Sequence, residues 1–362
     1  MAIKLVEVDD LEPGGVLGEA VIAASGKVLI NKGSVITEKI LARLVAWDIK
    51  SVSVVAAELA EVEVPQDPIE DNFEAPEEYH RFAQEYDVVV KAITQSFDFI
   101  RRQKLIPVHL FKDTSKQIAS SIEECESALI NRLLVNECQL ADAITRHSVM
   151  VAYLAGSFAS HMKWNDDDIH GVILSGLLHD AGKIVLDKAD AGKPYKHIVE
   201  AATLLSKIKG LTGDVVLGVV QHHEYIDGSG IPTKAKGDKI HRYAKLIAVA
   251  DIFQSEAYIR KLANPFPALN ILEHEMFGRL DPAICQDFIQ QIKNCLLNTK
   301  VLLSDGRTAE VIYFHPNGSA LPVVKTADGQ IVDTSAGGKI ILERLVPMEG
   351  LANSNDVIMA VS

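Results

Sequence analysis

Histidine and aspartate residues in the middle of the chain stand beside apolar stretches, and their types and spacing indicate a metal site. The set comprises His147, His179, Asp180, His197, His222, His223 and Asp251. His179-Asp180 follows the apolar run 172–178, and Asp251 follows the apolar run 246–250. A buried polar group is unfavourable unless it is paired or bound to a metal, so these positions favour a cluster of ligands over chance.

Imidazole and carboxylate ligands together suit iron, manganese, zinc and similar transition metals. An aspartate can bridge two ions, and two ions about 3.5–4 Å apart can bind a phosphodiester and activate a shared hydroxide. Lys183 lies four residues after His179 and three after Asp180, so we expect one helical face to carry all three. Residue types alone therefore predict two-metal hydrolysis of a phosphate ester.

The other histidines are interpreted as ordinary core or surface residues, because a single histidine on an apolar helix is usually one of these. These are His80, His109, His161, His170, His241, His274 and His315.

Apolar residues that recur every three or four positions predict a mostly helical region around the candidate ligands. We expect helices at 82–106, 118–134, 140–158, 215–223 and 242–258. Asn165 followed by three aspartates predicts a further helix that runs to His179, because Asn caps free N–H groups and acids favour the positive end of the helix dipole. The glycine-containing segment 224–240 is expected to be a loop.

Changes in composition predict a mainly α fold with a helical metallohydrolase domain between two small modules. Short strand-like runs, a helix at about 37–47 and hairpin turns such as Asp305-Gly306 support the flanking modules. The predicted segments are an N-terminal α+β accessory or regulatory module (1–62), an acidic Pro-containing linker (63–79), the helical domain (80–298), a small antiparallel β domain (299–347) and a tail (348–362).

Overall composition excludes several classes of partner. The chain has 362 residues, 48% of them hydrophobic, with 49 acidic and 36 basic side chains and a formal charge of -13. The acidic excess argues against binding a nucleic acid polymer. No run approaches the roughly 18 apolar residues of a membrane span, and no signal peptide pattern is present, so we expect a cytoplasmic protein without a membrane span. The four cysteines form no C-x-x-C pair and are interpreted as reduced core thiols.

Two stretches resemble the HD phosphohydrolase superfamily and, within it, the HD-GYP branch. They read HDAGKI at 179–184 and HHEYIDGSGIP at 222–232, and His147 and Asp251 complete the pattern. The resemblance covers about residues 140–298. It implies a metal-dependent phosphodiesterase that hydrolyses cyclic di-GMP, a bacterial second messenger, to linear pGpG, to GMP or to both. It also implies two divalent transition metal ions, with iron or manganese expected first.

The resemblance assigns roles by matching position. The first metal would be held by His147, His179, Asp180 and Asp251, and the second by His197, His222 and His223, with Asp180 bridging. A hydroxide between the metals would attack phosphorus, and Lys183 would stabilise charge on the phosphate or protonate the leaving oxygen. The expected substrate contacts are Gly228, Gly230, Ile231, Arg260 and Lys261, although a solvated helix end is an open alternative for the last two.

Three positions depart from the family pattern. The Tyr of Gly-Tyr-Pro is Ile231 here, and an isoleucine neither donates a hydrogen bond nor stacks as a tyrosine does. Some members hold a third metal through a Glu one turn before the first His, and that position is Ala143 here, so two metals are expected. After Asp251 the family usually has Asp-Ala where this chain has Gln254-Ser255, and a few following residues are missing, which would reshape the substrate pocket.

Two alternatives to cyclic di-GMP hydrolysis stay open. One is a metal-containing module that senses nucleotides and acts through signalling-protein partners with little turnover, which the change at Ile231 and the shortened segment after Asp251 favour. The other is a hydrolase of a different phosphate ester. A homodimer is a further hypothesis, because helical domains of this kind with a flanking module often associate.

Overall fold

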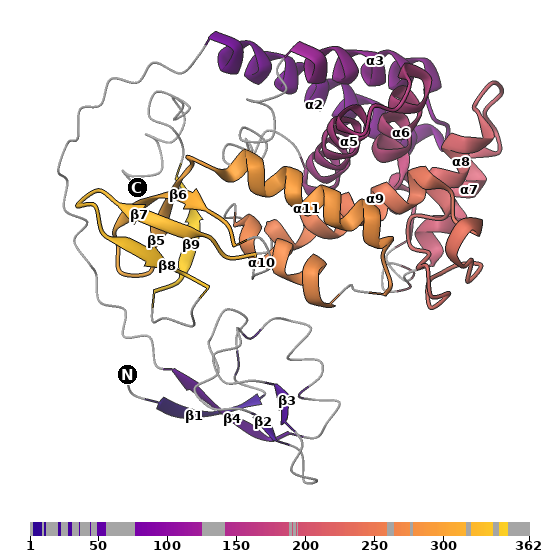
Figure 1. Cartoon of the computed structure of the whole chain (residues 1–362). Helices are drawn as coiled ribbons and strands as arrows, with labels where there is room; N and C mark the ends of the chain where they lie inside the picture. The colour runs from indigo at the N-terminus through magenta and orange to yellow at the C-terminus, as the bar shows by residue number, and fades with distance from the viewer. Residues whose placement is uncertain are drawn as a thin grey trace, which may run out of the picture. The chain divides into compact units, whose positions relative to one another are not determined.

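The computed structural model describes most of the helical region and parts of both ends of the chain. The described residues are 3–8, 21–22, 28–30, 49–55, 77–124, 142–187, 195–258, 264–275, 278–315, 320–335 and 340–346, with single positions at 11, 36, 44, 190 and 193. The chain divides into two compact units, Met1–Glu70 and Asp71–Ser362. Figure 1 shows the elements of each unit, which are described separately below. The predicted division into five segments stays a prediction, and the tail 348–362 lies outside the described residues.

The first unit contains two antiparallel strand pairs over a small core. β1 (Ile3–Glu7) pairs with β4 (Ser51–Val55), and β2 (Val21–Ile22) pairs with β3 (Val28–Ile30). The buried residues are Val8, Val21, Ile36, Leu44 and Val52. Strand β1 was not predicted, because five residues of mixed pattern carry little signal by themselves. The helix predicted at 37–47 lies, apart from Leu44, outside the described residues.

The second unit begins with the helices that build the site, which confirms the mainly α fold. The helices are α2 (Glu77–Gln103), α3 (Val108–Glu124), α5 (Ala143–His161), α6 (Asp166–Leu178), α7 (Lys196–Leu205), α8 (Gly213–Val220), α9 (Arg242–Ala257), α10 (Pro265–Asn270) and α11 (Pro282–Leu296). Shorter turns are the 3-10 segments η2 (Ala181–Ile184) and η4 (Gly237–Lys239) and the π-helical segment η5 (Ile271–Glu275). Helix α3 begins at Val108, earlier than the predicted 118, because its first turns are mostly polar and hide the apolar period.

Helix α5 is the centre of this unit. Every residue from Ser148 to Ala159 is buried, and the helix packs against α2, α3, α6 and α9. A helix that is apolar on all sides is the one that other helices surround. His147 immediately precedes this buried stretch, so it stands at the edge of the core rather than at the surface.

Capping residues set where the site helices begin. Asn165 caps α6 by accepting a hydrogen bond from the Asp168 N–H at 3.0 Å, as the sequence predicts. Asp142 caps α5 in the same way through the Thr145 N–H at 2.8 Å. The cap fixes the first residue of each helix, and the apolar run fixes its length. Together they determine where the candidate ligands at the helix ends lie.

A five-stranded antiparallel sheet follows α11. Its strands are β5 (Lys300–Leu303), β6 (Thr308–Tyr313), β7 (Val323–Thr326), β8 (Ile331–Asp333) and β9 (Leu342–Leu345), in the order β8-β7-β6-β5-β9. Asn264, which caps α10, also donates its side-chain N–H groups to the carbonyls of Leu342 and Glu343. The buried strand residues join the same core as the helices. Strand β8 was not predicted, because its three residues are mostly exposed and show no apolar alternation.

In the part of the chain that the structure describes, no helix combines the length and the apolar character that crossing a bilayer requires.

Candidate metal centre

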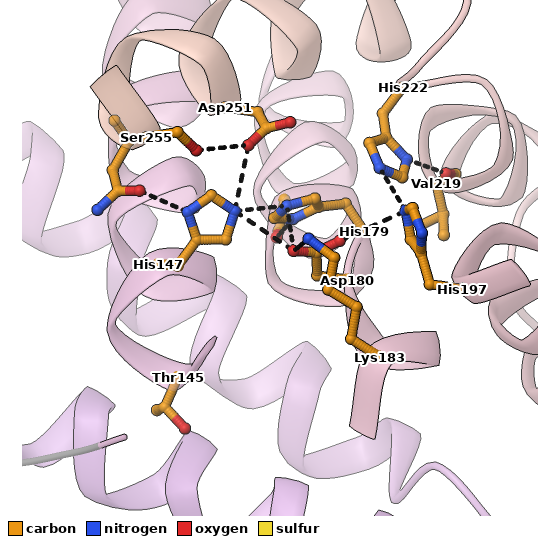
Figure 2. Close-up of polar contacts among 12 residues, drawn as sticks. Thr145, His147, His179, Asp180, Lys183, His197, Val219, His222, Asp251 and Ser255 are labelled. Carbon is orange, nitrogen blue, oxygen red and sulfur yellow. Dashed lines mark hydrogen bonds and ion pairs between the residues drawn. The ribbon is translucent and has the colours of Figure 1, made fainter. Parts of the chain in front are cut away.

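The first group of predicted ligands lies where α5, α6 and α9 meet. His147 belongs to α5, His179 ends α6, and Asp251 belongs to α9. His147 Nε2 lies 3.1 Å from His179 Nε2 and 3.2 Å from Asp251 Oδ1 (Figure 2). The same nitrogen lies 3.4 Å from Asp180 Oδ2. Two imidazole nitrogens and two carboxylate oxygens therefore surround one small volume.

The second group consists of three histidines from different segments. His197 is in the first turn of α7, while His222 and His223 follow the end of α8. Ligand atoms of all three lie within 4.8 Å of one another, and the Nε2 atoms of His197 and His222 are 3.4 Å apart. Gly182 allows η2 to lie against α7, because a Cβ there would be 1.8 Å from the His197 carbonyl oxygen. This contact sets His197 beside the His-Asp pair.

Asp180 lies between the two groups. One carboxylate oxygen, Oδ2, faces His147 at 3.4 Å and His179 at 3.5 Å. The other oxygen, Oδ1, faces His197 Nε2 at 3.6 Å. Asp180 is 1% exposed, and its Oδ1 has no hydrogen-bond partner. A buried carboxylate oxygen to which nothing donates is energetically unfavourable. A cation bound at this position would supply the missing partner.

Backbone carbonyls at helix ends determine which ring nitrogen of His179 and of His222 is free to bind a metal. His179 Nδ1 donates to the Gly176 carbonyl at 2.7 Å, and His222 Nδ1 donates to the Val219 carbonyl at 2.5 Å. The last carbonyls of a helix have no partner within it, so they accept from these rings. Each neutral ring then has its lone pair on Nε2, the atom that faces the cluster. This tautomer is the one a metal ligand needs.

Burial keeps most of the imidazoles uncharged. It lowers the pKa of His179 and of His222, and it lowers the pKa of His197 to about 4. For His147 burial also acts to lower the pKa, but hydrogen bonds with Asp180 and Asp251 outweigh it and raise the pKa to about 10.

The donor set fits transition metal ions. Buried neutral imidazoles and low-pKa carboxylates are the protonation states that bind a cation. Burial would raise the pKa of Asp251, but its hydrogen bond with His147 holds that pKa well below the usual range. The structure brings all seven predicted ligands into the two adjoining groups, and His179 and His222, one from each group, have ring centroids 5.1 Å apart.

Comparison with protein families agrees with this arrangement. Residues 128–284 match the family model for the HD domain. The chain contains an HD domain. The match spans both ligand groups and all the helices that carry them, and it confirms the resemblance that the motifs indicate.

Several curated proteins are similar to this chain. Cyclic di-GMP phosphodiesterase PA4108 of Pseudomonas aeruginosa is 25% identical over 321 residues, 85% of this chain and 75% of that protein. 3'3'-cGAMP-specific phosphodiesterase 1 of Vibrio cholerae is 30% identical over 45% of this chain and 41% of that protein. The cyclic di-GMP phosphodiesterase response regulator RpfG of Xanthomonas campestris is 24% identical over 47% of this chain and 51% of that protein. The solved structure of Bd1817, described as a HDG"Y"P protein from Bdellovibrio bacteriovorus, has a TM-score of 0.49 and 18% identity over 79% of this chain and 98% of that one.

Lys183 contacts the candidate metal centre from the short segment η2, not from the helix that was predicted to carry it. Its Nζ donates to Asp180 Oδ2 at 2.5 Å, and its side chain is 45% exposed. The expectation of one helical face shared with His179 is wrong, because α6 ends at Leu178 and Lys183 lies in the separate segment η2. The lysine nevertheless keeps its charged end between the Asp180 carboxylate and solvent.

The loop after His223 folds back onto the ligand segment of the HD domain. The Ile231 N–H donates to the His223 carbonyl at 3.0 Å. Gly230 permits this approach, because a Cβ there would lie 2.4 Å from Glu224 Cα. Gly228 has φ of +78°, a conformation that favours glycine. The other two predicted substrate contacts, Arg260 and Lys261, lie outside the described residues.

Glu224 is a buried residue that the sequence reasoning missed. Its carboxylate accepts from the Thr233 N–H at 2.6 Å, the Thr233 hydroxyl at 2.7 Å and the Ala235 N–H at 3.0 Å. It is 3% exposed. Its position directly after His222-His223 was the available signal. Glu224 therefore holds the far side of the loop against the segment that carries His222 and His223.

Proposed function

We propose that this chain is a two-metal phosphodiesterase of the HD-GYP type that hydrolyses cyclic di-GMP to linear pGpG, to GMP or to both. The observation that carries the proposal is the position of Asp180, with one carboxylate oxygen facing each group of histidines. A carboxylate so placed suits a bridge between two cations, which is the arrangement of two-metal phosphoryl chemistry. The names of the similar proteins, phosphodiesterases of cyclic di-GMP or 3'3'-cGAMP, support the substrate class.

The residues of the first group would hold one ion and those of the second group the other, with iron or manganese as the first expectation. Two cations held there would offset the negative charge of a phosphodiester that approaches a chain of net charge -13. Ala143, four residues before His147, offers no carboxylate, which favours two ions rather than three.

The protein's own groups have separate tasks in the hydrolysis. Water adds to phosphorus, the bond from phosphorus to the leaving ribose oxygen breaks, and that oxygen takes up a proton. Lys183 is the group suited to stabilise charge on the phosphate or to supply this proton, because its ammonium lies 2.5 Å from Asp180 and remains open to solvent. The carbonyls of Gly176 and Val219 hold His179 and His222 in the tautomer that binds a cation.

The test is to purify the protein without oxygen, measure bound metals, incubate it with cyclic di-GMP and identify products by chromatography. Two metals per chain together with pGpG or GMP are the expected result. Two metals with intact cyclic di-GMP would reject the proposed activity while leaving the metal centre in place. Because such a second messenger acts inside bacterial cells, the proposal includes the expected cytoplasmic location.

A second substrate is favoured by the three similar Vibrio cholerae proteins, which are named as 3'3'-cGAMP-specific. The change at Ile231 alters the loop where the family has a tyrosine. The same assay with 3'3'-cGAMP and a simple aryl phosphodiester separates these substrates. Binding of a cyclic dinucleotide without turnover of any of them would instead support a sensing module that acts through signalling partners, and size measurement in solution would test the homodimer.

A further inference from the structure

Gln254 connects two helices of the metal centre through both ends of its amide. It lies in α9, three residues after Asp251, and is 7% exposed. Its Oε1 lies 2.5 Å from His147 Nδ1 in α5. Its Nε2 donates to the sulfur of Met150, also in α5, at 3.7 Å. The side chain therefore holds the helix that bears His147 to the helix that bears Asp251.

The orientation of the amide determines the position of the proton on His147. A carbonyl oxygen accepts but cannot donate, so His147 Nδ1 must carry the hydrogen. The opposite orientation of the amide would turn its oxygen toward the Met150 sulfur, which has no proton to give. When the ring is neutral, as a metal ligand must be, the hydrogen on Nδ1 leaves the lone pair on Nε2, the nitrogen that faces Asp180 and Asp251.

His147 differs in this respect from two of the other ligands. The Nδ1 atoms of His179 and His222 donate to backbone carbonyls, which no substitution at the accepting residue removes. The partner of His147 Nδ1 is a side chain and is neutral, whereas a carboxylate in that place would make the imidazole a stronger donor to a metal. Of these three histidines, His147 is the one whose orientation depends on the identity of another residue.

We propose that Gln254 is a positioning residue, which fixes the tautomer and the ring orientation of His147 and thereby selects Nε2 as the atom presented to the first metal ion. The inference rests on the proposed two-metal centre and is independent of which phosphodiester is the substrate. It requires that loss of the Gln254 oxygen weakens one metal site and spares the site of His197, His222 and His223.

The experiment is a titration of the metal-free protein with Mn²⁺ in competition with a chelator, which reads metal affinity without activity. Gln254→Leu removes the acceptor at similar size, and Gln254→Glu restores an acceptor. Gln291→Leu is the matched control, because Gln291 is a buried glutamine of α11, outside the ligand groups. We expect Gln254→Leu to weaken one site by about 10- to 100-fold, as removal of such an orienting partner typically does. Gln254→Glu should bind at least as tightly as wild type, and Gln291→Leu should be unchanged.

Each other outcome overturns the inference in a distinguishable way. Equal affinity of wild type and Gln254→Leu at both sites would show that the amide does not orient His147. Equal weakening of both sites, or a lowered melting temperature of the metal-free Gln254→Leu protein beyond that of Gln291→Leu, would show a general packing effect. Failure of Gln254→Glu to restore metal affinity would also show a packing effect, because an acceptor for His147 Nδ1 would be present without restoring the site. Wild-type protein that binds no Mn²⁺ or Fe²⁺ would instead refute the proposed metal centre itself.

Discussion

Replacement of Glu224 by alanine should release the loop that follows the His222-His223 pair. The carboxylate accepts three hydrogen bonds, from the Thr233 N–H, the Thr233 hydroxyl and the Ala235 N–H. A hydrogen bond to a charged group contributes about 1.5–3 kcal/mol, so three give a gross value of about 4.5–9 kcal/mol. Water can partly replace the lost acceptor, because Thr233 is exposed, and we expect a net loss of about 2–4 kcal/mol of loop stability.

Amide hydrogen exchange measures this loss directly. A change of 1.4 kcal/mol is about tenfold, so the amides of Thr233 and Ala235 should exchange about 30- to 700-fold faster in Glu224→Ala. Both metals should remain bound, since Glu224 belongs to neither ligand group. If the loop contacts substrate, KM should rise more than kcat falls.

Asp227→Ala is a matched control within the same loop. Its carboxylate accepts from the Ser229 N–H at 2.8 Å and from the Ser229 hydroxyl at 2.7 Å, but it is exposed. This variant should speed exchange at Ser229 and leave Thr233 and Ala235 within a few-fold of wild type. Exchange at Thr233 and Ala235 within threefold of wild type in Glu224→Ala would refute the reasoning, because the carboxylate would then not hold the loop.

Three further substitutions test the centre. Asp180→Ala should lose metal at one or both positions by elemental analysis, and two full equivalents would contradict the bridging role. Lys183→Ala should keep both metals and lower kcat by about 10²–10³-fold, the usual effect of removing one stabilising donor, so unchanged single-turnover rates would remove the lysine from the chemistry. Ile231→Tyr should tighten binding or speed turnover of cyclic di-GMP if the loop departure weakens either, and no effect would leave the segment after Asp251 as the better explanation.

Local sequence was sufficient to select His179, His222 and Asp251 as candidate ligands, because each comes at the end of an apolar run, whereas His197 was matched by the family resemblance. His179 comes where the apolar period of α6 stops, and the Asn165 cap marks where that helix begins. A polar residue at the end of a buried run is unusual enough to be noticed without any knowledge of the fold. The mainly α fold could be predicted for the same reason, since a strong period of 3.6 residues is the most reliable local signal.

The roles of Glu224 and Gln254 could not be predicted in this way, because each depends on contacts across the fold. Gln254 meets His147 across 107 positions, and only the packing of α5 against α9 brings the two together. The sequence shows Gln254 merely as a departure from a family pattern. The expected helical face at Lys183 was wrong because a helix that ends at Leu178 cannot be distinguished by spacing from one that continues for another turn.

The ends of helices are what make this centre possible. A histidine in the middle of an α-helix has no free backbone carbonyl beside it, because each one is already paired within the helix. At the end of α6 the Gly176 carbonyl is free to accept from His179, and at the end of α8 the Val219 carbonyl accepts from His222. His147 lies near the start of α5, where free groups are N–H donors rather than carbonyls, so its Nδ1 needs an acceptor from elsewhere. A side chain from α9 meets that need, and the requirement for Gln254 thus follows from the place of His147 in its helix.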